Sequence, residues 1–544
     1  MGTQVWWKNA VIYQIYPRSF MDSNNDGIGD IRGIIGKLDY LEWLGIDAVW
    51  ICPVYKSPND DNGYDISDYM DIMDEFGTMA DMDELILKAK EKNIRIIMDM
   101  VFNHTSDEHK WFIEARKSKD NPYRDYYIWR DPVNGDKPNE LGSVFSGSAW
   151  QLDETTGQYY LHLFSKRQPD LNWENEAVRK NIIEVIKFWV NKGVSGFRLD
   201  MIELLGKLPD EMITANGPKL HDYIKELYRE GFNCNGKAEE IVTIGECWAA
   251  DTDIALKYTE PDNKELSMVF QFEHSALDEI KGKGKWALKE MRLTELKSII
   301  DKWQLQYDKG WNTLFWNNHD LPRIVSRFGN DKEYRVESAK MLALYLYCLK
   351  GTPFIYQGEE IGMTNIKFDT IEEYKDIEIH NMYKEKKAEG VAEEDIMKSI
   401  YAKGRDNART PMQWNDEINA GFTKGIPWIK VNNNYKEINV KKDMEDNNSV
   451  LHFYQNLIKM RKDILCIREG NYIPLLNEDE DIAAYTRNTN GQGILVIANF
   501  HECTKKISFS DIVSKRIIIS NYNRTEIDLK DVEIRPYEAV MCEI

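Results

Sequence analysis

The chain has no CxxC pair and no even, regularly spaced set of cysteines. Its seven cysteines are scattered between positions 52 and 542. An odd, scattered set argues against a disulfide framework and a zinc site, and favours a reducing compartment. The opening text, MGTQVWWKNAVIYQIYP, also lacks the basic start and apolar run of a signal peptide, so we expect a cytoplasmic protein.

Long apolar runs and excess positive charge are missing as well. The longest apolar stretch, MLALYLYCL at 341–349, is too short to cross a bilayer. A net charge of -21 repels nucleic acid and anionic membranes, so we expect neither as a partner. The 544 residues exceed the usual size of a single core, and 42% of them are hydrophobic, which predicts one large globular domain with additions.

What the sequence does contain is a regular alternation of strand-like and helix-like segments. Eight such units predict a closed parallel (β/α)8 TIM barrel, formed by residues 1–104 and 173–466. The strand-like segments are 10–17, 46–53, 94–104, 194–201, 240–248, 267–274, 311–320 and 352–360.

Two stretches depart from this alternation. Residues 105–172 are rich in aromatics and turns with little helical pattern, which predicts a subdomain inserted after the third strand. From about 467 to 544 the pattern becomes short alternating strands, which predicts a small antiparallel all-β domain.

Charged side chains stand at the predicted strand ends, where a strand interior is normally apolar. Arg198 and Asp200 end the fourth strand and, being two residues apart, point to the same side. Glu246 ends the fifth strand, and His319 with Asp320 ends the seventh. Because catalytic residues of such barrels lie at the carboxyl ends of the strands, we expect these groups to meet at one mouth.

Three converging carboxylates suit chemistry on a neutral polyol. Glycoside hydrolysis needs an acid that protonates the leaving oxygen and a second carboxylate at the anomeric carbon. We expect Arg198 to lower the pKa of Asp200, and Glu246, with fewer cations nearby, to hold its proton as the acid. The alternative interpretation is a network of strand-end salt bridges without a chemical role.

The loop DSNNDGIGD at 22–30 places oxygen-bearing residues at nearly every second position. Such a set favours calcium, with magnesium second. An EF-hand is excluded because the twelfth residue from Asp22 is Gly33 rather than glutamate. The alternative is a solvated polar turn. The candidate ligands of this structural calcium are Asp22, Asn24, Asp26, the carbonyl of Ile28, and Asp30.

The strand-end motifs DMVFNH, GFRLD, IGE and NNHD resemble the four signature regions of glycoside hydrolase family 13, the α-amylase family. QPDLNW resembles its fifth region, and GRDNARTPMQW and FIYQGEEIGMTN extend the likeness over nearly the whole chain. Within the family the text is most similar to dextran glucosidases and oligo-1,6-glucosidases, through LGKLPDEMITANGPKLHDYIKEL and ELSMVFQFEH.

The resemblance implies a retaining mechanism with three catalytic residues. Asp200 would be the nucleophile, Glu246 the general acid/base and Asp320 the transition-state stabiliser. A retaining mechanism predicts that the two carboxyl groups lie about 5–5.5 Å apart. The non-reducing glucose would be gripped by Asp65, His104, Arg198, His319 and Arg409, and the family's calcium loop matches residues 22–30.

Three further positions bear on the leaving-group side, and a neighbouring cysteine does not. Trp248 shares the strand face of Glu246 and would stack on the leaving sugar, or pack at the rim. Lys285 lies where the resemblance places a leaving-side lysine; the alternative is a solvated lysine. Met201 replaces the valine typical of α-1,6-specific relatives, which leaves the linkage preference open. Cys247 points away from the mouth and is interpreted as packing.

The leading hypothesis is an exo-acting α-glucosidase that releases glucose from isomalto-oligosaccharides and short dextrans. We expect a small oligosaccharide as the partner and a monomer or weak oligomer. Alternatives are a sucrose- or maltose-preferring glucosidase and a trehalose-6-phosphate hydrolase, although no basic cluster for a phosphate is evident. A sucrose isomerase and an inert transporter heavy-chain ectodomain fit less well, since an arginine-rich loop and a membrane anchor are not found in the sequence.

Overall fold

The barrel predicted from the sequence is the core of the molecule. The computed structural model describes residues 5–236, 238–489 and 491–544. Eight strands form one parallel sheet whose spatial order follows the chain. The hydroxyl of Thr313 donates to the carbonyl of Val269 at 3.0 Å, so the two ends of the sheet meet. The strands are β1 (Ile12–Ile15), β2 (Ala48–Ile51), β5 (Arg95–Val101), β9 (Gly196–Asp200), β10 (Val242–Glu246), β11 (Met268–Phe270), β12 (Thr313–Leu314) and β13 (Thr352–Tyr356).

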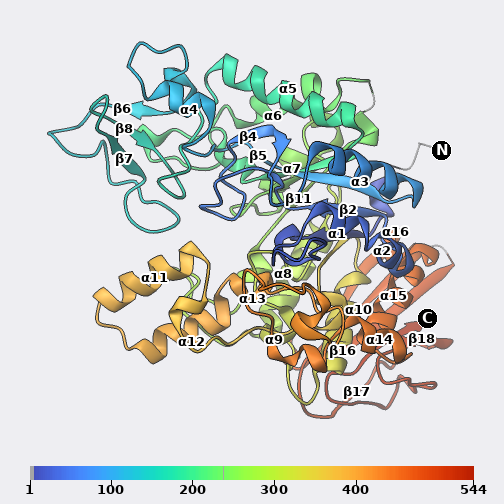
Figure 1. Ribbon diagram of the computed structural model, residues 1–544. Helices are drawn as coiled ribbons and strands as arrows, with labels where there is room; N and C mark the ends of the chain where they lie inside the picture. Colours follow the sequence, from blue (N-terminus) through green and yellow to red (C-terminus); the bar gives the residue numbers. More distant parts are fainter. Residues whose placement is uncertain (1–4, 237, 490) are drawn as a thin grey trace.

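Helices cover the outside of this sheet (Figure 1). Local sequence signals set their ends: Thr78 and Asp81 form a reciprocal capping box at the start of α3, and Gly193 ends α5 with a left-handed φ of 101°. These helices are α1 (Ile31–Ile35), α2 (Leu38–Leu44), α3 (Met79–Glu91), α5 (Glu176–Lys192), α6 (Leu220–Glu226), α7 (Thr252–Thr259), α8 (Leu293–Leu305), α9 (Ile324–Arg327), α10 (Arg335–Tyr347), α14 (Val440–Glu445), α15 (Val450–Asp463) and α16 (Leu465–Glu469).

Apolar side chains divide between the two faces of the sheet. Phe197 and Leu199 of β9 belong to the large cluster between sheet and helices. Val242 and Ile244 of β10 belong to a second cluster that fills the barrel interior. Because successive strand residues face opposite sides, Glu246 shares the interior face of Ile244, and the even-numbered residues of β9 share the interior as well.

Two excursions flank the carboxyl ends of the strands. Between β5 and α5, helix α4 (Lys110–Ala115) precedes a three-stranded sheet of β6 (Trp129–Arg130), β7 (Trp150–Asp153) and β8 (Gln158–Leu161). Beyond β13, helices α11 (Ile377–Ala388) and α12 (Glu393–Lys403) project on the same side of the molecule (Figure 1). The two meet where the hydroxyl of Ser146 donates to Glu385 at 2.8 Å and Asn381 donates to the carbonyl of Phe145 at 3.2 Å.

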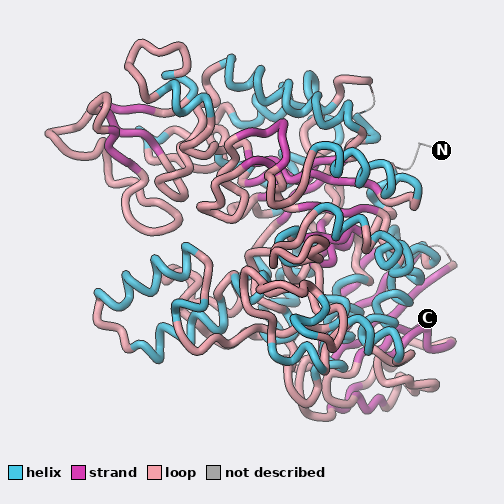
Figure 2. Tube along the Cα trace, in the orientation of Figure 1, coloured by secondary structure: helices cyan, strands magenta, loops and turns pink. Residues whose placement is uncertain are grey.

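A smaller β domain completes the chain (Figure 2). Its five-stranded antiparallel sheet has the order β14–β15–β16–β20–β18, with β17 and β19 as a separate pair. The hydroxyl of Tyr485 donates to the carbonyl of Tyr345 at 2.7 Å and ties the sheet to α10. Among the described residues no helix is long and apolar enough to cross a membrane. The strands are β14 (Asn471–Leu475), β15 (Ile482–Thr489), β16 (Gln492–Asn499), β17 (Lys505–Ile507), β18 (Arg516–Ser520), β19 (Val532–Ile534) and β20 (Ala539–Glu543).

Candidate active site

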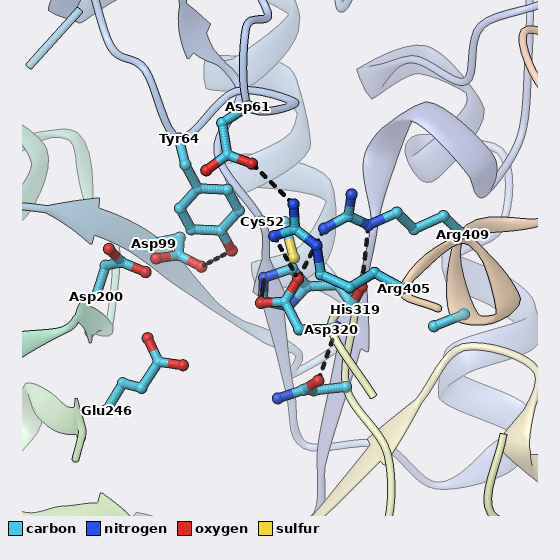
Figure 3. Close-up of polar contacts among 12 residues, drawn as sticks. Cys52, Asp61, Tyr64, Asp99, Asp200, Glu246, His319, Asp320, Arg405 and Arg409 are labelled. Carbon is cyan, nitrogen blue, oxygen red and sulfur yellow. Dashed lines mark hydrogen bonds and ion pairs between the residues drawn. The ribbon is translucent and has the colours of Figure 1, made fainter. Parts of the chain in front are cut away.

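The guanidinium of Arg198 joins the predicted catalytic pair. One nitrogen, Nη1, lies 2.8 Å from Asp200 and 3.0 Å from Asp99, and the other, Nη2, lies 2.5 Å from Glu246. Strand alternation explains the convergence, since residues 198, 200 and 246 all face the barrel interior. The structure therefore brings Asp200 and Glu246 to one guanidinium, and Figure 3 shows the two carboxyl groups near each other.

One guanidinium charge is shared among three buried carboxyl groups, and this changes the expected titration of Asp200. Burial raises the pKa of Asp200 well above its usual range, Glu246 adds to the rise, and Arg198 opposes it. The expectation that Arg198 gives a net lowering is not met, because burial raises the pKa of Asp200 by more than this shared guanidinium lowers it, and Glu246 and Asp99 add to the rise. Protonation of Glu246 removes its repulsion, so Asp200 ionises most easily when Glu246 carries the proton.

Glu246 is held by two further donors. The indole Nε1 of Trp248 donates to Oε1 at 3.1 Å, and the backbone N–H of Met201 donates to Oε2 at 3.3 Å. Met201 has a left-handed φ of 41°, a strained conformation for a methionine that aims its N–H at the acid. Glu246 therefore has less freedom, and a more cationic neighbourhood, than the strand pattern suggested.

Asp320 stands in a cationic surround. Nε2 of His319 lies 3.0 Å away, a nitrogen of Arg409 lies 2.7 Å away and one of Arg405 lies 3.3 Å away. Although burial alone would raise it, these partners hold the pKa of Asp320 well below its usual range. Burial opposes protonation of His319, but Asp320 raises the pKa of His319 to about 10, so the pair is ionic at neutral pH.

A cavity of about 370 Å³ opens at this mouth, with Asp200, Glu246 and Asp320 in its wall. His104 also lines it and contacts the carbonyl of Tyr64 at 3.0 Å through Nε2. Burial lowers the pKa of His104 to about 4, so this ring is neutral. His104 can therefore exchange hydrogen bonds with a sugar hydroxyl without adding charge.

Asp61 lines the cavity, whereas the predicted contact, Asp65, does not. Asp65 is fully buried and accepts hydrogen bonds from Ser57 at 2.9 Å and from the N–H groups of Asp60 and Asp61 at 2.8 and 3.1 Å. The left-handed turn that follows Asp61 directs Asp65 back into its own loop. Asp61 instead meets Arg405 at 3.3 Å, as Figure 3 shows.

The two arginines of the GRDNAR motif occupy different places in the site. Arg405 lines the cavity, while Arg409, on α13 (Asp406–Arg409), bonds Asp320 and the carbonyl of His319 from behind. The sequence reasoning named Arg409 and missed Arg405, although both stand in one motif. It also missed Glu378 of α11, which lies far from any motif and carries no sequence signal.

The leaving-group side combines an aromatic ring with paired charges. Trp248 is 45% exposed in the cavity wall, with its ring stacked on Phe272 at 3.9 Å between centroids. Lys285 lies in the wall 2.5 Å from Glu378. Cys247 is buried in the core beneath the helices, as the strand phase indicated.

Acidic groups outnumber cations in the cavity wall. The cations Lys285, Lys403 and Arg405 each form an ion pair with at least one carboxylate. The acids in the wall are Asp61, Asp200, Glu246, Glu279, Asp320 and Glu378. This surface can bind hydroxyl groups and resists a dianionic ligand.

The loop at 22–30 has oxygen types that suit a hard cation. Asp22 accepts four hydrogen bonds, from the N–H groups of residues 24, 25 and 27 and from the hydroxyl of Thr423, which fills its acceptor sites. Asn24 Oδ1 and each oxygen of Asp26 accept one hydrogen bond, and the carbonyl of Ile28 accepts none from the described residues. Anywhere among the residues that the structure describes, no cluster of three or more acidic, histidine or cysteine side chains is arranged as a metal site.

Asp30 connects this loop to the first helix. Its carboxylate accepts the N–H and hydroxyl of Ser23 at 2.8 and 2.9 Å and caps α1 through the N–H of Gly33 at 2.7 Å. The donor set is thus compatible with calcium, and in its present conformation the loop is braced by its own hydrogen bonds.

Comparison with known proteins agrees with this geometry. Residues 14–470 match the family described as "Alpha amylase, catalytic domain", and residues 482–541 match "Alpha-amylase SusG C-terminal domain". The chain is 55% identical over 562 residues to an oligo-1,6-glucosidase of Parageobacillus thermoglucosidasius, which covers 99% of both chains. It is 51% identical over 542 residues to a glucan 1,6-alpha-glucosidase of Streptococcus pneumoniae, again covering 99% of both.

Among solved structures, the trehalose-6-phosphate hydrolase of Bacillus licheniformis superimposes with a TM-score of 0.94 at 46% identity, covering 99% of this chain and all of the other. The likeness extends through both the barrel and the C-terminal domain. The chain therefore belongs to the α-amylase family and is a glycoside hydrolase.

Proposed function

We propose that this enzyme is a retaining exo-α-glucosidase that removes glucose from the non-reducing end of α-1,6-linked isomalto-oligosaccharides and short dextrans. The observation that carries the proposal is the Asp200–Arg198–Glu246 arrangement, in which two carboxyl groups share one guanidinium in the wall of a sugar-sized cavity. The relatives named oligo-1,6-glucosidase and glucan 1,6-alpha-glucosidase support the choice of linkage.

In the first step the Asp200 carboxylate attacks the anomeric carbon, and the bond from that carbon to the leaving oxygen breaks. The proton of Glu246 passes to the leaving oxygen. Departure of this proton leaves Glu246 anionic beside Nη2 of Arg198, which stabilises the new charge. Asp320, ionised by its three cationic neighbours, lies where it can bind sugar hydroxyls as positive charge develops on the ring.

In the second step Glu246 accepts a proton from water while the water oxygen attacks the same carbon and displaces Asp200. Two displacements at one carbon retain its configuration. The indole of Trp248 and the N–H of Met201 keep Glu246 aimed in both steps.

Exo action is supported by the ion pair between Asp61 and Arg405. It joins the loop between β3 (Tyr55–Lys56) and β4 (Asp68–Ile72) to the segment that precedes α13, and Arg405 also contacts Asp320. All three groups line the cavity, so their ion pairs would obstruct further units beyond a sugar seated against them. Single glucose units are therefore the expected products.

A neutral leaving group is supported by the charges of the wall. Each cation there already has a carboxylate partner, and six acids line the cavity. A phosphorylated leaving sugar would lack a free cation and meet repulsion, which disfavours trehalose 6-phosphate despite the similarity to a hydrolase of that sugar.

The decisive experiment compares kcat/KM on isomaltose, isomaltotriose, maltose, sucrose and trehalose 6-phosphate, with the anomer of released glucose followed by NMR. We expect the two isomalto-oligosaccharides to lead, trehalose 6-phosphate to be at least about a hundredfold poorer, and α-glucose to form first. A preference for sucrose or maltose would reject the α-1,6 assignment, and β-glucose as the first product would reject retention. The same panel on M201V tests whether Met201, in the cavity wall, sets the linkage.

Three further proposals concern the protein as a whole. A structural calcium ion at residues 22–30 is supported by the donor types and by the carbonyl of Ile28, which has no hydrogen-bond donor among the described residues. A cytoplasmic location is supported by seven free cysteines, five of them buried. A monomer or weak oligomer remains our expectation, which sedimentation at several concentrations would test.

A further inference from the structure

Glu203 is a buried acid next to the active site without a cationic partner. It belongs to the 3-10 helix η4 (Ile202–Leu204), three residues after Asp200, and only 2% of it is exposed. Among the described residues no lysine, arginine or histidine forms an ion pair with it. Burial of a carboxylate is costly, so a buried acid without a counter-ion points to a specific role.

The carboxylate of Glu203 holds the backbone that follows β10. Oε1 accepts the N–H of Trp248 at 3.0 Å, and Oε2 accepts the N–H of Ala249 at 3.1 Å. The side chain of Asn216 is a third hydrogen-bond partner. These bonds fix the peptide that begins only two residues beyond Glu246.

Trp248 transmits this placement to the acid/base. Its ring lies flat on Phe272, with 7° between the planes, and its indole Nε1 donates to Oε1 of Glu246 at 3.1 Å. The backbone of Trp248 is thus anchored by Glu203, its ring by Phe272, and its N–H is directed at Glu246. A shift of the backbone would move the indole away from the acid.

We propose that Glu203 is a positioning residue for proton transfer, which pins the 248–249 backbone so that the indole of Trp248 orients Glu246 toward the leaving oxygen. The inference rests on the proposed role of Glu246 as acid/base. Glu203 itself does not line the cavity and acts only through Trp248.

The ionised form of Glu203 is the one that the loop stabilises. Burial raises the pKa of Glu203 to about 7, while the N–H groups of Ala249 and Trp248 lower it and the Glu246 charge raises it. The other titratable groups that sense Glu203 are Cys247 and Tyr258, both with raised pKa values and neutral at pH 7. The backbone N–H groups of Trp248 and Ala249, together with the side chain of Asn216, therefore compensate the buried charge.

The variant E203Q tests this directly, because glutamine keeps the volume but turns an N–H donor toward the amide of Ala249. The substrates are dinitrophenyl, nitrophenyl and unsubstituted phenyl α-glucosides, which present one ring of similar size but leaving groups of increasing basicity. The kinetic readout is kcat/KM, which covers the steps up to glycosylation. A poorer leaving group depends more on proton donation, so loss of orientation steepens the dependence on the leaving group.

We expect E203Q to lower kcat/KM about tenfold or more for the phenyl glucoside and less than about threefold for the dinitrophenyl glucoside. W248F keeps a ring on Phe272 but removes the N–H, and should show the same selective loss. In the double variant the losses should not multiply, because both changes break one pathway. E265Q is the matched control: Glu265 is buried but ion-paired with Lys225 at 3.6 Å, and its change should leave the leaving-group dependence unaltered.

Three outcomes overturn the inference: equal loss on all three glucosides in E203Q, an unchanged leaving-group dependence in W248F, or losses that multiply in the double variant. If E203Q does not fold, W248F alone still tests the inference. An unaltered leaving-group dependence in W248F would show that the indole of Trp248 does not orient Glu246. Failure of the proposed function is separate, since it would appear in the wild-type enzyme as a preference for sucrose or maltose or as β-glucose released first.

Discussion

Asp200 and Glu246 lie at the two terminal nitrogens of one guanidinium, at 2.8 Å from Nη1 and 2.5 Å from Nη2 of Arg198. The planar fork of arginine fixes both carboxyl groups relative to each other, which a lysine could not do. The pair is therefore oriented before any sugar binds, and the charges of the two carboxyl groups are coupled through the same cation.

The first prediction concerns the covalent intermediate. D200N should lower kcat by about four orders of magnitude or more, because the nucleophile is lost while the volume is kept. E246A should react with dinitrophenyl α-glucoside and accumulate a glucosyl-enzyme, since that leaving group departs without an acid while the second step lacks its base. Mass spectrometry of peptides should find the glucosyl group on Asp200. A label on another residue, or an active D200N enzyme, would reject the assignment.

The second prediction separates Asp61 from Asp65. D61N should lower kcat/KM about a hundredfold with little change in Tm, because it removes a charged group that faces the sugar. D65N should instead destabilise the fold by about 1–3 kcal/mol, because Asp65 is buried and accepts hydrogen bonds from three residues. Thermal unfolding and kinetics on both variants provide the check. If D65N lost activity and D61N lost stability instead, Asp65 would be the residue that contacts the sugar.

The third prediction is a pH dependence of stability from His319. Its folded pKa of about 10 exceeds the unfolded value of about 6.5, so its pairing with Asp320 stabilises fully below pH about 6.5 and is lost as pH rises toward about 10. The Tm difference between wild type and H319Q should therefore shrink over this range.

The control for this measurement is H274Q. Burial lowers the pKa of His274 to about 4, so it stays neutral from pH 6.5 upward and its Tm difference should be constant. If H319Q showed the same constant difference as H274Q, the ionic pair of His319 and Asp320 would have to be given up.

The fourth prediction concerns calcium at residues 22–30. A chelator should lower Tm by roughly a few degrees and leave kcat almost unchanged when assayed below that Tm, because the ion would brace the loop and does not reach the cavity. D26N removes an exposed candidate ligand, so its Tm should no longer respond to chelation. An unchanged wild-type Tm in the chelator would show that calcium does not stabilise this loop.

Local sequence was sufficient for the elements and their faces. Alternation along β9 and β10 already placed residues 198, 200 and 246 on one side, because strand side chains alternate strictly and barrel strands are parallel. Asp61 and Glu378 could not be found in this way. Asp61 reaches the cavity through an irregular turn. Glu378 lies on α11, and the position of that helix depends on tertiary packing.

The titration behaviour also lay beyond the sequence. Arg198 beside Asp200 suggested a lowered pKa, but a pKa depends on every charge nearby and on burial, and three carboxyl groups from three strands share that guanidinium. The opposite holds at Asp320, where cations from distant segments gather. Sequence alone determined the order of strands and helices, and with it which strand-end residues stand at the barrel mouth, because these follow from periodicity. Only the tertiary structure decided which of those residues touch, which are charged and which acid faces the sugar, because contacts between distant segments set burial and electrostatics.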